Sequence, residues 1–396
     1  MTALNILFTV ILAIAALYFF IILLILAGVF RLKRFTRPGI NPMTKITVII
    51  PVRNEEETIS TCLTDLYRQD YPLEQISVVV VNDASTDRTE EIVKEFAYSH
   101  PDFHLQLIRT LPVENDRAFK KHSICSGIEA SSGELVVTTD ADTRSGPGWI
   151  STLAGFYEQF HPKMIIGPVA FHEEGSFFER LQSLEFAGLI AATAGSCSMG
   201  FPLMCNGANL AFNRNAYEET RDSRDGFRYP SGDDLFLMMK ILKKYRKQSV
   251  RFLFSEEAII LTKAKKTPAE FFSQRLRWVS KSRGYTDRVV SAVAIVTYLF
   301  NLLLLATLIT GIFNIHILLL FLILFGIKIF LELPAVYKIL VLFRKTRLLF
   351  LYPLTQVIDL VYVSAIGLLG NLIPYKWKGR RVSPLMRNNP EKPLQT

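Results

Sequence analysis

The first thirty residues contain the stretch that most limits how this chain can fold. Residues 4–30 read LNILFTVILAIAALYFFIILLILAGVF and carry no charged side chain. A helix of about 20 apolar residues spans the core of a bilayer. The stretch is too long for the apolar part of a signal peptide, no basic segment precedes it, and no small-residue cleavage motif closes it. We therefore predict an N-terminal transmembrane helix within residues 1–32.

The other end of the chain contains three more apolar stretches. They cover residues 289–313, 315–340 and 348–373, and they define a C-terminal membrane region, residues 288–375, followed by a basic tail, residues 376–396. Within the second stretch Lys328 and Glu332 are four residues apart, a spacing that lets them pair on one helix face. Helices of this length and composition predict an integral membrane protein, with a bacterial-type plasma membrane as the expected location.

The basic residues of the chain predict its orientation in the membrane. Several follow the first helix directly, at positions 31, 33, 34 and 37, which places the next domain in the cytoplasm by the positive-inside rule. One helix before that domain and three after it would put the C-terminus outside, although the basic segments 343–347 and 376–381 also favour the cytoplasm. We therefore expect an irregular, re-entrant or interfacial element at 348–373, the segment that carries Pro353, Gln356 and Asp359.

The composition narrows the class of protein. Of the 396 residues 50% are hydrophobic, and the formal net charge is +9, which together suit a soluble domain attached to membrane helices. A positive net charge can attract nucleic acid, an anionic membrane surface or phosphorylated substrates. Here it lies largely at the membrane borders and no aromatic-basic module is present, so we expect no nucleic-acid partner.

Residues 45–265 alternate strand and helix patterns. KITVIIPVRN at 45–54 and ISVVVVND at 76–83 read as buried strands, and the segment at 55–69 spaces its apolar residues for one helix face. Further strands are predicted at 103–110 and 133–142. Such alternation is typical of an α/β domain with a mostly parallel, Rossmann-like sheet, whose ligands bind beyond the carboxyl ends of the strands.

Polar residues follow three of these predicted strands. Asn54 and Glu55 come after the first, Asp83 after the second, and Asp140 and Asp142 after a later one. In an extended segment residues i and i+2 point to the same face, so the last two carboxylates are expected to converge. Like charges repel unless a cation lies between them. Carboxylates without a histidine or cysteine cluster favour Mg²⁺ or Mn²⁺, often shared with phosphate oxygens, so a donor that bears a diphosphate is expected.

Two downstream segments complete the candidate site. Asp233 and Asp234 precede an apolar helix pattern, where one acid can complement the helix dipole and a second can act as a general base. Residues 266–287 mix aromatic and basic side chains, a composition that suits a helix at the membrane interface. Their sequence includes QRLRW at 274–278.

Together these motifs resemble a membrane-integrated family 2 glycosyltransferase with a GT-A domain, the group that includes cellulose, hyaluronan and poly-N-acetylglucosamine synthases and ceramide glucosyltransferase. The resemblance covers residues 45–285 and rests on VVNDASTD, DAD, the acidic pair and QxxRW in the right order. The pair is Asp-Asp where many members have Glu-Asp. The stretch FKKHSICSGI at 119–128 departs from the family's usual lysine-containing segment.

The resemblance implies a role for each matched residue on the donor side. It places Asp83, Asn54 and Glu55 near the nucleotide, and Asp140 and Asp142 at the diphosphate and the metal.

On the acceptor side it implies that Asp234 is the base and that Asp233 lies beside the substrate. Gln274, Arg277 and Trp278 would contact the donor diphosphate and the acceptor sugar. The reaction expected is an inverting transfer from a nucleotide-diphosphate sugar to a membrane-associated acceptor, preferably a lipid, at the cytoplasmic face.

Other functions remain open at this point. A processive polysaccharide synthase would need a channel, which three exit helices are few to enclose without a partner subunit or self-association. A catalytically silent scaffold would not need competent side chains at every motif position. A nucleotidyltransferase also uses paired acids and a metal, but it has no use for QxxRW.

Overall fold

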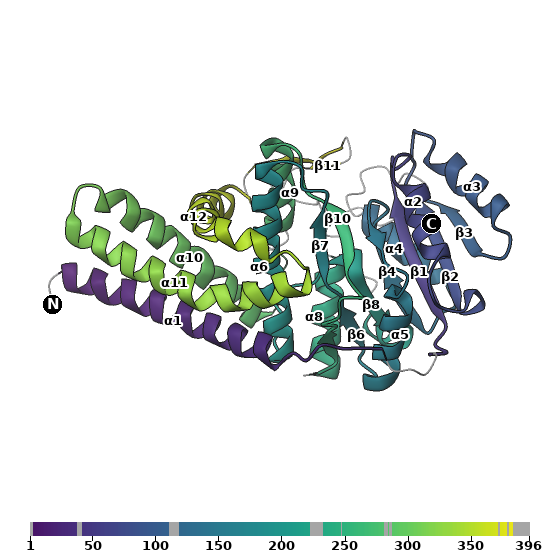
Figure 1. Cartoon of the computed structure of the whole chain (residues 1–396), viewed down its shortest axis with the longest axis horizontal. Coiled ribbons are helices and arrows are strands. Elements are labelled where there is room, and N and C mark those ends of the chain that lie inside the picture. Colours follow the sequence, from purple (N-terminus) through teal and green to yellow (C-terminus); the bar gives the residue numbers. More distant parts are fainter. Residues whose placement is uncertain are drawn as a thin grey trace, which may run out of the picture.

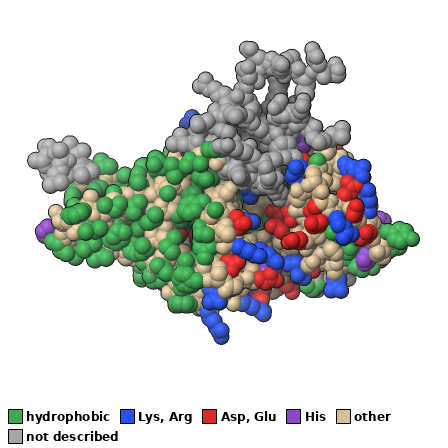
Figure 2. Space-filling view, turned by 90° about the horizontal axis from the view of Figure 1, so that it is seen from above, with side chains coloured by type: hydrophobic (Ala, Val, Ile, Leu, Met, Phe, Trp, Pro, Cys, Tyr) green, Lys and Arg blue, Asp and Glu red, His purple; other side chains and the backbone are tan. Residues whose placement is uncertain are grey.

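The computed structural model describes residues 3–37, 42–110, 119–221, 233–246, 248–280, 284, 287–370, 373–377 and 380–382. It consists of an α/β domain and a set of long apolar helices that extend from one side of it (Figure 1). The predicted fold class is therefore confirmed. Figure 2 shows hydrophobic side chains covering most of the helical half, whereas acidic and basic side chains gather over the α/β domain.

The α/β domain is built on a seven-stranded sheet. Its order is β3-β2-β1-β4-β8-β6-β9. Strands β1 to β4 pair in parallel, β8 runs antiparallel to both β4 and β6, and β9 is parallel to β6. The bounds are β1 Ile46–Val52, β2 Ile76–Asn82, β3 His104–Arg109, β4 Leu135–Thr138, β6 Met164–Ile166, β8 Leu210–Asn213 and β9 Val250–Phe252.

Helices cover this sheet where the apolar spacing predicts them. Helix α2 buries Ile59, Cys62, Leu63 and Leu66, the face expected from the sequence. The central strands are buried nearly throughout, as a sheet covered on both faces requires. The covering elements include α2 (Ile59–Tyr67), η1 (Leu73–Gln75), α3 (Thr89–Ser99), α4 (Phe119–Glu129), α5 (Trp149–Phe160) and α7 (Arg214–Thr220).

A smaller sheet and three helices connect the domain to the bundle. The small sheet has the order β5-β10-β7. The N-cap Ser176 and Glu179 form a reciprocal capping box that fixes where α6 begins. These elements are β5 (Arg144–Ser145), β7 (Val169–His172), α6 (Phe177–Ser198), η2 (Gly207–Asn209), α8 (Asp233–Tyr245), β10 (Ile260–Lys263) and α9 (Pro268–Ser280).

Three long helices form the bundle and lie side by side in Figure 1. They are α1 (Ala3–Arg31), α10 (Arg288–Gly311) and α11 (Ile315–Leu342). Side chains fill the space between them: the ring of Tyr18 stacks on that of Phe300 with centroids 4.1 Å apart. Lys328 and Glu332 pair at 3.0 Å, as their spacing predicts.

Polar contacts join the helices of the bundle to one another and to the α/β domain. The Lys338 ammonium of α11 donates to the carbonyls of Val29 in α1 and of Leu32 just after it, both at 2.8 Å. Arg34, which follows α1, and Arg344, which follows α11, both pair with Glu256 of the domain. The ends of α1 and α11 that carry basic residues therefore lie on the side of the α/β domain.

The last apolar segment is more regular than its sequence predicts. It consists of η4 (Thr346–Leu351) and an 18-residue helix, α12 (Tyr352–Leu369). The expectation of an irregular element is therefore wrong for the backbone of α12. Pro353 lies at the first turn of that helix, where its missing N–H costs no hydrogen bond.

The direction of α12 differs from that of the other long helices. It is seen end-on in Figure 1, whereas α1, α10 and α11 run across the picture. Before it, the Lys345 ammonium donates to the Phe171 carbonyl of β7 at 2.7 Å. After it, Gly370 approaches α9 so closely that a Cβ would lie 2.7 Å from Val279 Cγ1. The residue before η4 therefore lies beside the α/β domain and the residue after α12 lies beside α9, whereas the first turn of α12 contacts α11, because the Tyr352 hydroxyl donates to Glu332 at 3.2 Å.

Among the described residues, four helices are long and apolar enough to cross a membrane. They comprise Phe8–Arg31, Arg288–Gly311, Ile315–Leu342 and Thr346–Leu369. The last described elements are a short pair, β11 (Tyr375–Trp377) and β12 (Arg380–Val382), of which β11 packs against α9.

Candidate active site

The carboxyl ends of β1 and β2 carry two adjoining loops with unusual backbone. Asn54 and Ala84 both have positive φ angles, 52° and 49°, which non-glycine residues adopt rarely. The Asn54 side-chain oxygen accepts from the Thr86 N–H at 2.8 Å, and the Glu55 N–H donates to the Thr89 hydroxyl at 2.8 Å. These contacts hold two strained loops together at the edge where the sequence predicts nucleotide binding.

Asp83 lies in the second of these loops and is largely buried. Its carboxylate is 3.9 Å from Arg53 Nη1, and the same nitrogen donates to the Asp83 carbonyl at 2.6 Å. Arg53 therefore fixes both the backbone and the charge of this loop. It was not among the predicted site residues, although it lies within the polar PVRNEE segment that the sequence singles out.

The paired acids lie in a turn and not in a strand. β4 ends at Thr138, and the turn is closed by the Thr143 hydroxyl, which donates to the Asp140 carbonyl at 2.7 Å. The expectation that Asp140 and Asp142 extend from one face of a strand is therefore wrong. Both residues still follow the carboxyl end of β4, next to β1 in the sheet, because β4 pairs with β1 in parallel.

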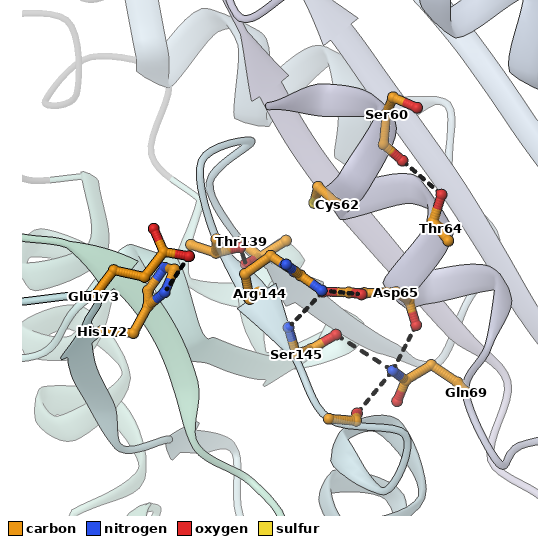
Figure 3. A network of polar contacts seen from close by, with 12 residues as sticks. Ser60, Cys62, Thr64, Asp65, Gln69, Thr139, Arg144, Ser145, His172 and Glu173 are labelled. Atoms are coloured by element: carbon orange, nitrogen blue, oxygen red, sulfur yellow. Dashed lines mark hydrogen bonds and ion pairs between the residues drawn. The ribbon is translucent and has the colours of Figure 1, made fainter. Parts of the chain in front are cut away.

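Helix α2 lies next to this turn, and Figure 3 shows the Arg144 side chain extending to Asp65 of that helix. Arg144, two residues beyond Asp142, makes a two-point ion pair with Asp65 at 2.6 and 3.1 Å. The Cys62 thiol lies 3.8 Å from the Asp140 carbonyl. Burial raises the pKa of this thiol to about 12, and the carboxylates of Asp65, Asp142 and Asp140 add to the increase. The carboxylates of three acids therefore lie near this thiol, in addition to the guanidinium of Arg144.

The donor set fits a hard divalent cation. Asp140 and Asp142 offer carboxylate oxygens, the ligands that Mg²⁺ and Mn²⁺ prefer, and Mg²⁺ is often completed by substrate phosphates. Within the described part of the chain no three histidine, cysteine or acidic side chains come together as a ready-made metal site. A cation at this turn would therefore need oxygens from water or a diphosphate as well.

Asp234, the acid that the resemblance implies as the general base, lies on helix α8 and faces the same edge of the sheet as the Asp140–Asp142 turn. The Asp234 carboxylate accepts from the Gly207 N–H at 3.2 Å and from the Leu235 N–H at 2.8 Å. Gly207 is in turn tied to β4, because the Thr138 hydroxyl donates to its carbonyl at 2.8 Å. Residue 207 therefore joins Asp234 to the strand that precedes Asp140 and Asp142. Asp233 begins α8, and its side chain lies outside the described residues.

The QxxRW motif lies on α9, beside α6 and α12. Gln274, Arg277 and Trp278 are all partly exposed. The segment before α9 is fixed to α6, because Gln182 donates to the Lys265 carbonyl at 2.8 Å and accepts from its N–H at 3.0 Å. The structure thus places this motif at the junction between the domain and the membrane helices.

Sequence reasoning found the acids but missed the residues that arrange them. Besides Arg53, these are Thr143, Arg144 and Gly207. The pattern CNGAN at 205–209 offered a signal, because Asn206 is a typical N-cap residue and its side chain accepts from the Ala208 N–H at the start of η2, where Gly207 lies.

The chain belongs to glycosyl transferase family 2. The family model described as glycosyl transferase family 2 matches residues 47–221. A second, described as glycosyl transferase family group 2, matches residues 135–343, more than half of the chain. The protein is therefore a glycosyltransferase enzyme, which argues against the scaffold and nucleotidyltransferase alternatives.

Several known proteins are similar to parts of the chain. The probable glycosyltransferase YdaM of Bacillus subtilis is 34% identical over 106 residues, 27% of this chain and 24% of the relative. An undecaprenyl-phosphate 4-deoxy-4-formamido-L-arabinose transferase of Edwardsiella ictaluri is 30% identical over 161 residues, 40% of this chain and 47% of the relative. The chain thus spans about half, or less, of the length of these curated relatives.

Among solved structures, a mannosyltransferase from Pyrobaculum calidifontis in complex with GDP-Man and Mn²⁺ shares the fold. Its TM-score is 0.54 at 20% sequence identity, with 91% of this chain and 98% of that chain covered. This likeness supports a GT-A-like fold.

Proposed function

We propose that this chain is an inverting, metal-dependent glycosyltransferase that moves one sugar from a nucleotide-diphosphate sugar to a lipid acceptor at the membrane. The observation that carries this proposal is the Thr138–Gly207–Asp234 connection, which joins a candidate base to the strand bearing the paired acids. Similarity to transferases named for undecaprenyl phosphate supports a lipid as acceptor. The neighbour with GDP-Man and Mn²⁺ supports a nucleotide sugar and a divalent cation.

Each predicted residue then has a task. Asp83, Asn54 and Glu55 hold the nucleotide at the ends of β1 and β2, while Asp140 and Asp142 face the diphosphate. A bound Mg²⁺ or Mn²⁺ would stabilise the negative charge that grows on the departing diphosphate.

The remaining groups act on the acceptor side. Asp234, whose orientation is fixed by two N–H groups, takes the proton of the acceptor hydroxyl as its oxygen attacks the anomeric carbon. Attack from the face opposite the leaving group inverts that carbon. Arg277 offsets charge on the leaving diphosphate. Trp278 offers its ring to a sugar, and Gln274 and Asp233 line the substrate.

The bundle favours a single transfer over processive synthesis. A polymer channel needs an open path between helices, whereas rings and aliphatic side chains fill the interior between α1, α10 and α11. Tyr18, Phe300, Leu304, Phe321 and Leu324 form this interior and are all buried. A processive synthase would therefore require a partner subunit or self-association.

A product assay tests the proposed function. Membranes from an expressing host are given a series of radiolabelled nucleotide sugars with Mg²⁺ or Mn²⁺, and membranes carrying Asp234→Asn serve as the control. We expect one added sugar in an organic-soluble lipid product and release of a nucleoside diphosphate without pyrophosphate. A long water-soluble polymer would contradict single transfer, and pyrophosphate release would contradict glycosyl transfer.

The arrangement of α12 also leads us to propose a membrane topology. The residue before η4 lies beside the α/β domain and the residue after α12 lies beside α9, which supports a course of η4 and α12 along the membrane surface while α1, α10 and α11 cross. Three crossings would put the basic segments 31–37, 343–347 and 376–381 on one side, which is the cytoplasmic side by the positive-inside rule.

This topology predicts which vesicles expose the C-terminus. A protease-cleavable tag at residue 396 should be cut in inside-out vesicles and protected in right-side-out vesicles. The same tag inserted between residues 312 and 314, at the far turn between α10 and α11, should show the reverse. Cleavage of the C-terminal tag in right-side-out vesicles would mean that α12 crosses the membrane.

A further inference from the structure

A buried ion pair lies inside the QxxRW helix but outside the motif's signature residues. Arg275, on α9, pairs with Glu185 of α6, and only 4% and 7% of these side chains are exposed. The second carboxylate oxygen of Glu185 accepts from the Tyr362 hydroxyl of α12 at 2.6 Å. One contact chain thus joins α9, α6 and the membrane-lying helix α12.

The Arg275 guanidinium also contacts two of the three signature residues. Its carbon lies 4.1 Å from the centroid of the Trp278 ring, and its Nη1 donates to the Gln274 side-chain oxygen at 3.2 Å. The ring of Phe271, one turn earlier, lies 4.6 Å from the same carbon. A planar guanidinium can stack on an aromatic face while its edge holds hydrogen bonds, which an ammonium cannot do. The geometry suits orientation of Trp278 and Gln274 together.

Stability alone explains this arrangement poorly. Moving two charges out of water costs free energy that their attraction offsets only when the remaining donors are also satisfied. Here the Arg275 Nε–H is buried and has no partner among the described residues. A pair of apolar side chains would fill the same space without that cost. A role of the Arg275–Glu185 pair in orienting neighbouring side chains therefore explains its burial better than a role in stabilising the fold.

We propose that Arg275, Glu185 and Tyr362 are positioning residues that hold Trp278 and Gln274 against the sugar that is transferred. This inference rests on the proposed function, because it assumes that Trp278 and Gln274 meet the substrate. Through its hydrogen bond to Glu185, Tyr362 connects the Arg275–Glu185 pair to α12. The orientation of the QxxRW motif then depends on the position of α12, the helix proposed to lie at the membrane surface where a lipid acceptor would arrive. The effect passes through contacts, and none of the three residues needs to touch the reacting atoms.

The double variant Arg275→Met with Glu185→Met separates positioning from stability. Either single variant leaves a buried charge or polar group unpaired and should lower the melting temperature, whereas the double variant should recover most of it. We expect kcat/KM for transfer in the double variant to stay about 10- to 100-fold below wild type, since small misplacements are costly. Nucleoside diphosphate affinity should fall less than kcat/KM, because Asp83 and the Asp140 turn lie on other elements and only Arg277 of α9 is proposed to meet the diphosphate. Recovery of transfer together with stability would overturn the proposal.

Two matched variants sharpen the test. Tyr362→Phe keeps the ring and removes one hydrogen bond to the buried Glu185, so it should lower kcat/KM by a few-fold and the melting temperature by less than either single methionine variant does. Lys244→Met with Glu219→Met removes an exposed pair on α8 and α7 and should change neither quantity. If the Tyr362→Phe protein had the kcat/KM of the wild type, Tyr362 and α12 would have no part in positioning Trp278 and Gln274.

A second readout does not depend on activity. Acrylamide quenching of Trp278, taken as the difference between each protein and its Trp278→Phe counterpart, should increase in the Arg275→Met, Glu185→Met double variant. Unchanged quenching would overturn the positioning role. If the wild-type protein transfers no sugar to any acceptor, the proposed function fails, while the quenching result still decides whether Arg275 holds the Trp278 ring.

Discussion

Replacing Asp234 by asparagine should lower the rate of sugar transfer by about 10²–10⁴-fold, the usual contribution of a general base. Asparagine keeps the shape, and its single side-chain oxygen can still accept from one of the two N–H groups, of Gly207 or of Leu235, that bond to different oxygens of Asp234. It cannot accept the proton of the acceptor hydroxyl. The affinity for a nucleoside diphosphate should remain near that of the wild-type protein.

The measurement compares kcat for transfer with the dissociation constant of the nucleoside diphosphate in purified protein. Asp102→Asn is the matched control: its carboxylate is exposed, accepts from the Tyr67 hydroxyl at 3.1 Å, and lies just before β3, at the opposite ends of the strands. That change should leave both quantities unaltered. If the Asp234→Asn protein turned over at a near-normal rate, another group would have to be the base.

Replacing Asp142 by asparagine should also reduce transfer strongly, but through the donor. Removing one carboxylate weakens the hold on a cation and the stabilisation of the leaving diphosphate, a loss of several kcal/mol or about 10²–10⁴-fold in rate. In contrast to Asp234→Asn, this variant should bind the nucleoside diphosphate more weakly in the presence of Mn²⁺. The difference between the two affinities separates a metal ligand from a base.

Removing the metal provides the complementary experiment. EDTA should abolish transfer by the wild-type protein, and Mn²⁺ or Mg²⁺ should restore it. Cys62→Ser is a suitable control for the Asp142→Asn protein, because the Cys62 thiol lies next to the same turn but is buried and carries no negative charge near neutral pH. Its dependence on Mn²⁺ should match that of the wild-type protein. Full activity in EDTA would rule out a metal-dependent mechanism, and unaltered Mn²⁺ dependence in the Asp142→Asn protein would remove Asp142 from the site.

The sheet and its rim were predictable because they depend on local patterns. A buried apolar run followed by polar residues marks a parallel strand and its carboxyl end, so the positions of Asp83 and Asp140 at one edge followed from alternation alone. The turn at Asp140 and Asp142 was not predictable in the same way. Whether a strand ends at residue 138 or 142 depends on side-chain hydrogen bonds such as that of Thr143, which sequence periodicity does not report.

Contacts between distant segments account for what the sequence could not show. Gly207 joins Asp234 to β4 through its backbone, and a backbone group has no residue signature. Arg275 reads in the sequence as one of several basic residues at a membrane border, whereas the fold buries it against Glu185, 90 residues earlier. The course of α12 was likewise hidden, since hydropathy gives the length of a helix but not its direction.

Anomalous diffraction from crystals grown with Mn²⁺ and a nucleotide sugar would test the central claim most directly. The account predicts a single manganese peak between the Asp140–Asp142 turn and the diphosphate, with the sugar's anomeric carbon facing Asp234 and its ring near Trp278. A manganese peak on another surface, or a diphosphate bound away from the ends of β1, β2 and β4, would contradict it.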